Sequence, residues 1–264
     1  MWTMLLSLLI LTAISAPAEG VDFTPLIPVH RTAMTPSDSL GPRLSVHKQA
    51  VVVMPTDWTT PQGIMQRYER SSPKDIWQPV GDVIPVVVGR NGLGWGIGLH
   101  PTVLPEGPEK REGDGRAPAG VFRLSSAFGY APSAKYPWIR LPYRETTPAL
   151  RCVDDVQSRH YNRIVDKSQI KPDWKSDEEM RRGDNQYRLG VVIDHNANPA
   201  IPGRGSCIFI HIWKESDTGT AGCTAMSQEN MERLLRWLDP AANPIIVQLP
   251  AATYKQLRPL WVLP

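Results

Sequence analysis

Short runs of β-branched and other apolar residues, separated by glycine-rich turns, constrain the fold of this chain more than any other feature. Runs at 50–54, 83–88 and 121–124 alternate with turns at 89–98 and 113–120. Runs of this length suit strands better than helices. The chain also has 26 prolines and 20 glycines, and these residues favour turns over long helices. The sequence therefore predicts many short strands.

The C-terminal third has the clearest succession of elements. Apolar runs at 190–194, 207–213 and 244–249 predict strands. Ser227 is a suitable N-cap for a helix that begins just after Cys223. A stripe of large apolar residues then recurs with helical spacing: Met231, Leu234, Leu235 and Leu238. The predicted order is strand, loop, cysteine, helix, strand.

The N-terminus predicts export. An apolar run at 5–14 is followed by Ala16-Pro17-Ala18, a small-x-small cleavage pattern. We expect residues 1–18 to be a signal peptide, with a buried helix or an uncleaved anchor as the alternative. Residues 19–48, rich in proline, predict an extended segment. The rest of the chain has no apolar stretch of the roughly 20 residues that a bilayer requires. We therefore expect a periplasmic or secreted protein that does not span the membrane after cleavage.

The middle of the chain, residues 127–189, is the least periodic part. It is rich in tyrosine and tryptophan among prolines and charges. It could cap a substrate cleft, or it could be a surface excursion whose aromatic residues fill a small core of their own. The charged run 177–182 predicts a solvated helix face.

Charge and cysteine content narrow the function. A net charge of +3 is too small to indicate a nucleic-acid partner, although it is compatible with an anionic cell wall. The three cysteines are Cys152, Cys207 and Cys223. An oxidising compartment pairs thiols, and an odd count leaves one thiol over.

Cys223 has the surroundings of a nucleophile. It follows Gly222 and precedes the predicted helix, whose dipole would favour the thiolate and lower the pKa of the thiol. Backbone N–H groups at Gly222 and Thr224 could face a developing oxyanion. A thiolate with such donors is suited to acyl transfer.

His211 is the candidate base. It lies on the predicted strand 207–213, with 11 residues between it and Cys223. An imidazole titrates near working pH and can take the proton of a thiol. The alternative is a buried free cysteine and a core histidine with its hydrogen bonds satisfied.

Other candidates carry less weight. His195 is a rival base, but its Asp-His-Asn tripeptide also suits a turn. The Glu-Gly-Asp-Gly sequence at 112–115 lacks the regular oxygen ligands of a calcium loop. A zinc site has four candidate ligands, with spacings that match no familiar pattern: Cys207, Cys223, His211 and His195. The sequence therefore predicts no metal and no cofactor.

Two motifs resemble those of a known family. The sequence Thr-Ala-Gly-Cys-Thr-Ala-Met at 220–226, preceded by His211, is similar to the signature of the L,D-transpeptidase (YkuD-like) catalytic domain. In that family a strand histidine precedes a Ser/Thr-His-Gly-Cys motif. The segment 115–122 is similar to the family's Thr-Pro-x-Gly-x-Phe segment. Ala221 and Ala225 depart from the pattern, and the histidine-to-cysteine separation is shorter.

The resemblance implies a fold and a set of roles. The fold would be mainly β, a sandwich or barrel over 49–264, with a helix after the cysteine and 127–189 as an insertion. Cys223 would be the nucleophile, His211 the base, and the Ile212 carbonyl the group that orients the imidazole. Three further residues are expected to bind substrate: Thr220, Trp213 and His195.

The activity that the resemblance implies is L,D-transpeptidation of peptidoglycan stem peptides through a thioester, without a cofactor. Two alternatives remain open. Water could replace the amine acceptor, giving a carboxypeptidase or endopeptidase, or the chain could be a wall-binding module without catalysis. With Cys223 in the nucleophile's role, we hypothesise that Cys152 and Cys207 form a disulfide that ties the insertion to the core. The sequence does not predict an oligomeric state.

Overall fold

The computed structural model describes residues 44–264. The expected signal peptide and residues 19–43 of the expected extended segment lie outside the described residues. The strands are β1 (Gln49–Pro55), β2 (Gln62–Glu69), β3 (Gln78–Val87), β4 (Leu93–Trp95), β5 (Ala117–Gly129), β6 (Tyr143–Glu145), β7 (Leu150–Val153), β8 (Ile164–Asp166), β9 (Asp177–Glu179), β10 (Leu189–Ile193), β11 (Phe209–Ile212), β12 (Thr224–Met226) and β13 (Ile245–Gln248). The helices are α1 (Gln228–Trp237) and α2 (Ala251–Trp261), with short 3-10 turns at Ser133–Lys135 and Pro240–Ala242.

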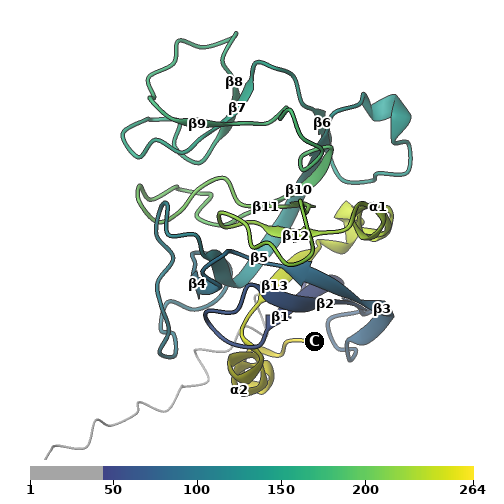
Figure 1. The fold of residues 1–264 in the computed structure, drawn as a ribbon. Coiled ribbons are helices and arrows are strands. Elements are labelled where there is room, and N and C mark those ends of the chain that lie inside the picture. Colours follow the sequence, from purple (N-terminus) through teal and green to yellow (C-terminus); the bar gives the residue numbers. More distant parts are fainter. Residues whose placement is uncertain (1–43) are drawn as a thin grey trace, which may run out of the picture. The chain divides into compact units, whose positions relative to one another are not determined.

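The main sheet closes into a barrel (Figure 1). Its strands follow the order β10-β11-β12-β3-β2-β1-β13-β5, and β5 then pairs with β10 to complete the circuit. Most pairs are antiparallel, but β1 with β13 and β11 with β12 run parallel. This architecture confirms the predicted mainly β fold with a helix after Cys223.

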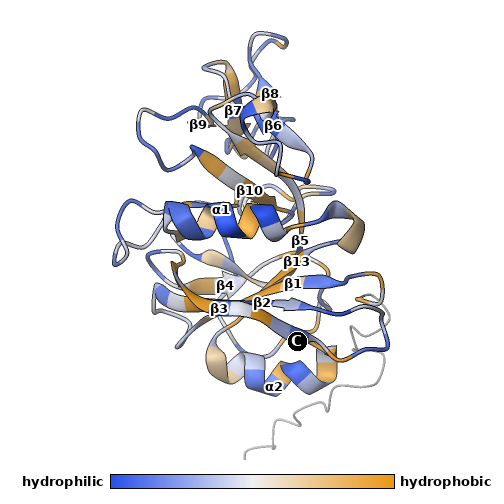
Figure 2. Ribbon diagram, turned by 90° about the vertical axis from the view of Figure 1, so that its right-hand side faces the viewer, coloured by the Kyte–Doolittle hydropathy of each residue, from blue (hydrophilic) through white to orange (hydrophobic). Residues whose placement is uncertain are grey.

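The barrel core explains why the β-branched runs form strands. Ala50 to Val53 of β1 are completely buried, as are Ile245 to Val247 of the neighbouring β13. A strand covered on both faces is apolar throughout rather than alternating. Figure 2 shows the apolar colouring of β1 and β3 and the two-sided colouring of α1.

Helix α1 begins as predicted. The Ser227 hydroxyl accepts a hydrogen bond from Asn230 N at 3.3 Å, the arrangement of an N-cap. The side chains of its buried stripe pack on the barrel: Met231, Leu234 and Leu235. The predicted helix is therefore confirmed, and its apolar face fixes it beside β10 and β11.

Helix α2 was not predicted from the sequence. Pro250 precedes it and Pro259 lies in its last turn, so its sequence has the appearance of a loop. Its fully buried Trp261 packs against the rings of Trp95 and His100. Among residues 44–264, no helix has the length and apolar character needed to cross a membrane.

Residues 127–189, the segment expected to be an insertion and called the insertion below, contain a second, three-stranded sheet in the order β8-β7-β9. Figures 1 and 2 both place this sheet beyond β10 and β11, at the end of the barrel opposite α2. A disulfide between Cys152 of β7 and Cys207, just before β11, joins the two parts, as hypothesised. The insertion and the barrel also share a buried cluster: Phe128, Leu150, Cys152, Met180, Tyr187, Cys207, Phe209 and Cys223.

Removing this disulfide is expected to destabilise the protein. Its cysteines are 55 residues apart in the chain, and closing a loop of that length restricts the unfolded state by about 4 kcal/mol in the chain-entropy model. The double variant Cys152→Ala, Cys207→Ala should therefore lose about that much free energy of unfolding in urea titrations. A loss below about 1 kcal/mol would show that the insertion is held by its packing instead.

Candidate active site

A cavity of about 470 Å³ lies where the barrel meets the insertion. The barrel contributes Lys110, Glu112 and Gly113 of one loop, residues 206–208 with His211, and the turn 219–223. The insertion contributes a set of mostly charged side chains: Asp154, Asp177, Glu178, Arg182, Gln186 and Tyr187. A larger groove, of about 860 Å³, lies by β2 and the 240–242 turn, but no thiol or imidazole lines it. The chemistry therefore belongs to the smaller cavity.

Cys223 lies at the floor of this cavity, 7% exposed. Its Sγ accepts a hydrogen bond from Phe209 N at 3.4 Å and donates to the Cys207 carbonyl oxygen at 3.6 Å. Burial, with the charge of Glu178, raises the pKa of the thiol to about 12. The resting sulfur is thus protonated at neutral pH.

The expected effect of the helix dipole on Cys223 is therefore wrong. Strand β12 (Thr224–Met226) lies between the cysteine and α1, which begins only at Gln228. The dipole acts mainly within the first turn of a helix. Burial decides the protonation state of the thiol instead.

His211 lies on β11 with its ring fixed by backbone. Its Nδ1 donates to the Ile212 carbonyl oxygen at 2.8 Å, so Nε2 keeps its lone pair. The ring of Tyr187 packs edge-on against the imidazole, with centroids 5.1 Å apart. Burial lowers the pKa of His211 to about 4. At neutral pH the imidazole is neutral and able to accept a proton at Nε2.

The parallel pairing of β11 with β12 brings the two residues together. Ile210 is opposite Thr224 and His211 is opposite Ala225, so the register places Cys223 opposite Phe209. Side chains two residues apart on a strand share a face, and in-register neighbours of a parallel pair do so too. Cys223 and His211 therefore emerge on one face, about 6.6 Å apart along the strand direction and about 4.8 Å across it. Both line the cavity.

Thr220 braces the turn that carries the cysteine. Its hydroxyl donates to the Cys223 carbonyl oxygen at 2.6 Å and accepts from Gly222 N at 3.1 Å. A Cβ at Gly222 would lie 3.0 Å from the Arg116 carbonyl oxygen, closer than side chains normally approach. Gly222 therefore permits the close approach of this turn to Arg116, the residue before β5. The Gly222 N–H already donates to the Thr220 hydroxyl, so it must give up that hydrogen bond before it can donate to an oxyanion.

Thr224 follows as the first residue of β12. Its backbone is opposite Ile210 in the sheet, and its buried hydroxyl donates to Gln248 Oε1 on β13. The Thr224 side chain thus faces the core, and only its backbone is near the sulfur.

The structure places neither His195 nor Trp213, both expected to bind substrate, in the lining of the cavity. His195 is buried outside the cavity, where Nδ1 accepts from Ile97 N and Nε2 donates to the Arg204 carbonyl oxygen. Both ring nitrogens are therefore hydrogen-bonded to backbone groups. Burial lowers the pKa of His195 to about 3. Trp213 lies past the end of β11, half-exposed and away from the cavity lining. The zinc alternative also fails, because Cys207 is bonded to Cys152.

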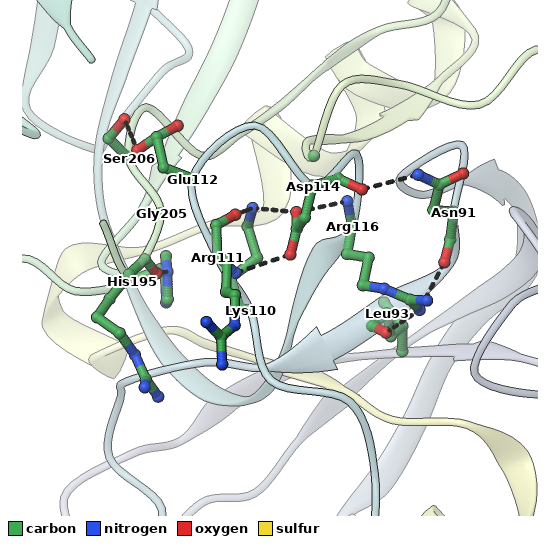
Figure 3. Close-up of polar contacts among 12 residues, drawn as sticks. Asn91, Leu93, Lys110, Arg111, Glu112, Asp114, Arg116, His195, Gly205 and Ser206 are labelled. Carbon is green, nitrogen blue, oxygen red and sulfur yellow. Dashed lines mark hydrogen bonds and ion pairs between the residues drawn. The ribbon is translucent and has the colours of Figure 1, made fainter. Parts of the chain in front are cut away.

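Loop 110–116 forms one wall of the cavity and is held by its own polar groups (Figure 3). The Asp114 carboxylate accepts three hydrogen bonds: from Lys110 Nζ (2.6 Å), Arg111 N (2.7 Å) and Arg116 N (2.9 Å). The arrangement presents Glu112 to the Ser206 hydroxyl, 2.7 Å away. The Asp114 carboxylate is thus a structural brace for the loop.

Sequence reasoning missed the residues that the insertion contributes. The charged run 177–182 is β9 and the turn that follows it, where a solvated helix was expected. Its Glu178 accepts a hydrogen bond from the Tyr187 hydroxyl, and burial raises the pKa of this carboxyl group. Arg182 binds Asp184 at 2.9 Å and Glu178 at 3.6 Å. No periodicity marks these residues, because three-residue strands between loops are too short to show one.

Comparison with protein-family models gives a match that covers most of the barrel. The model described as the L,D-transpeptidase catalytic domain (YkuD) matches residues 76–247, from the start of β3 to the end of β13. The matched region contains both Cys223 and His211. Comparison with curated proteins and with solved structures gave no match.

Proposed function

The chain belongs to the L,D-transpeptidase catalytic domain family, and on this premise we propose that it transfers the acyl group of a peptidoglycan stem peptide through a thioester on Cys223. The observation that carries the proposal is the placement of Cys223 and a neutral His211 on one face of β11 and β12, in the same cavity. A thiol and a base that share a cavity are the two groups that nucleophilic acyl transfer requires.

In the first half-reaction, the Cys223 sulfur attacks the carbonyl carbon of the peptide bond between an L-centre and a D-centre. The thiol proton passes to His211 Nε2, while Nδ1–H stays on the Ile212 carbonyl oxygen. Backbone N–H groups of the turn 222–224 stabilise the oxyanion. When the intermediate collapses, the imidazolium gives its proton to the leaving amine, and D-Ala departs.

In the second half-reaction, the amine of a diamino acid side chain attacks the thioester. His211 accepts a proton from that amine and returns one to the sulfur as the new amide forms. The enzyme regains its neutral thiol and neutral imidazole, so the proton balance closes over one turnover.

The pKa values of Cys223 and His211 are shifted in opposite directions, which disfavours proton transfer before the substrate binds. With the thiol pKa raised to about 12 and the imidazole pKa lowered to about 4, proton transfer between them is unfavourable in the empty site. It becomes favourable as the sulfur bonds to the substrate carbonyl and loses its negative charge. The resting cysteine is therefore kept in its less reactive thiol form.

We further propose that the protein works outside the cytoplasm. The Cys152–Cys207 disulfide supports this, because such bonds persist in oxidising compartments. Peptidoglycan, the substrate class of the family, lies in the same place. The apolar segment 5–14 supplies the predicted route of export.

Product analysis tests the proposed reaction. The purified protein is incubated with a disaccharide tetrapeptide that carries a diamino acid, and the products are identified by mass spectrometry. We expect free D-Ala together with a cross-linked dimer. Free D-Ala with a tripeptide alone would assign the hydrolytic alternative. Unchanged substrate, with the protein co-sedimenting with peptidoglycan, would contradict catalysis and assign a binding module.

A further inference from the structure

The insertion places a tyrosine between the proposed nucleophile and a carboxyl group. Tyr187 is 2% exposed, and aromatic contacts with Phe128, Phe209 and His211 fix its ring, with centroids 5.1 to 5.6 Å apart. Its hydroxyl donates to Glu178 Oε1. Tyr187 and Cys223 belong to the same buried cluster and line the same cavity, and hydrogen bonding by Tyr187 acts to lower the pKa of the Cys223 thiol against the larger effect of burial.

Glu178 acts on the sulfur in the opposite direction. Its negative charge is the second cause, after burial, of the raised pKa of Cys223. Arg182 lies 3.6 Å from the Glu178 carboxylate but makes its shorter contact, 2.9 Å, with Asp184. Arg182 therefore neutralises Glu178 only in part, and the carboxylate still opposes a thiolate beside it.

A tyrosine hydroxyl has one proton to donate. While Glu178 is ionised, the carboxylate takes this hydrogen bond, because a charged acceptor binds it more strongly than a neutral thiol. If the charge on Glu178 is removed, the proton is free to turn to the sulfur. A hydrogen bond to the sulfur stabilises the thiolate over the thiol.

We propose that Glu178 and Tyr187 form a pair that sets the reactivity of the Cys223 sulfur. With Glu178 ionised, the pair holds the sulfur as a thiol; with Glu178 neutral, Tyr187 donates to the thiolate and favours it. The inference rests on the proposed function, in which this sulfur is the nucleophile. The pair makes and breaks no covalent bond to the substrate, and the thiol proton still passes to His211 Nε2.

The groups that surround the pair define the conditions for a test. Charged and titratable side chains face it from the barrel loop, the insertion and β11: Lys110, Glu112, Asp154, Asp177, Arg182, Asp184 and His211. Replacing Glu178 with glutamine, a neutral side chain of the same shape, leaves the charges of these surrounding groups in place. Glu179, the next residue on β9, is a matched control, since it is exposed and pairs with Arg151 at 3.0 Å.

The test is the rate at which iodoacetamide alkylates Cys223 in the full chain, followed by intact mass between pH 6 and pH 10. Cys223 is the free cysteine, because the other two are bonded to each other. Glu178→Gln should raise the rate at pH 8 about tenfold, equivalent to a pKa lower by about one unit. Adding Tyr187→Phe to Glu178→Gln should remove part of this gain, because the hydroxyl that donates to the thiolate is then absent. Glu179→Gln should change the wild-type rate less than about twofold, as should Tyr143→Phe, whose hydroxyl donates to the Ala131 carbonyl oxygen outside the cavity.

A gain in Glu178→Gln that is partly lost in the double variant separates the proposal from a structural role. Loss of folding would expose the thiol and speed its alkylation in both variants, and circular dichroism spectra would report it. Equal rates in Glu178→Gln and the wild type, or a folded double variant that is alkylated as fast as Glu178→Gln, would overturn the inference. The assay uses no peptidoglycan. It can therefore succeed if the proposed acyl transfer is wrong, and it can fail if that function is right.

Discussion

Replacing Cys223 with alanine is expected to abolish D-Ala release from a stem tetrapeptide, with a loss on the order of 10⁵-fold or more in rate. The substitution removes the atom that forms the thioester, and the other two cysteines are held in the disulfide. Cys223→Ser should be similarly inactive, because a hydroxyl is far harder to deprotonate than a thiol and His211 is a weak base in its buried site. Release of D-Ala is measured by mass spectrometry.

Thr218→Ala is a suitable control for this variant. Thr218 lies on the same loop as Cys223 but is exposed, and its hydroxyl bonds only to neighbouring Asp217. It should release D-Ala at the wild-type rate. A Cys223→Ala protein that still released D-Ala within about tenfold of that rate would show that another group attacks the peptide.

Replacing His211 with alanine is expected to lower the rate by about 10²- to 10⁴-fold, the usual contribution of a general base. The residual activity should also depend on pH in a new way. Because burial raises the pKa of the Cys223 thiol to about 12, only hydroxide can then supply the thiolate. The residual rate should rise about tenfold per pH unit between pH 7 and pH 10.

The wild-type protein should show a flat profile over the same range. Its His211 pKa of about 4 keeps the imidazole neutral throughout, and activity should fall only as the pH approaches that value. His160→Ala, on the half-exposed surface of the insertion, should retain the flat wild-type profile. A flat residual rate in His211→Ala would contradict the role of His211 as the base.

The sequence predicted short strands and a helix from local features that each reflect one physical cause, while the sandwich or barrel was implied by the resemblance to a known family. β-branched runs mark strands buried on both faces, as in β1 and β13, and the Ser227 cap with its apolar stripe marks α1. Cys223 and His211 could be paired because only 11 residues lie between them and both fall in the motif that resembles the family signature. The parallel register then places both side chains on one face.

The rest depended on contacts that local sequence does not contain. His195 could be a ligand or a core residue, and only its bonds to Ile97 and Arg204 decide the question. The protonation state of Cys223 follows from burial under the insertion, which reverses the direction expected from a helix dipole. Glu178 lines the cavity from the three-residue strand β9, Tyr187 lines it from the turn before β10, and the disulfide joins this part of the chain to the barrel. Such an arrangement leaves no periodic signal.

The central claim is that the acyl group of the substrate is carried on Cys223. Acylation of Cys223 by a carbapenem tests this claim most directly. The strained lactam carbonyl of a carbapenem acylates a nucleophile without releasing a leaving group, so the adduct stays on the protein. Intact mass should increase by one carbapenem per chain, and digestion with trypsin should place that mass on the peptide of residues 215–233, in which Cys223 is the single cysteine. A protein that iodoacetamide labels at Cys223 but that gains no carbapenem mass, or gains it on another peptide, would contradict the account.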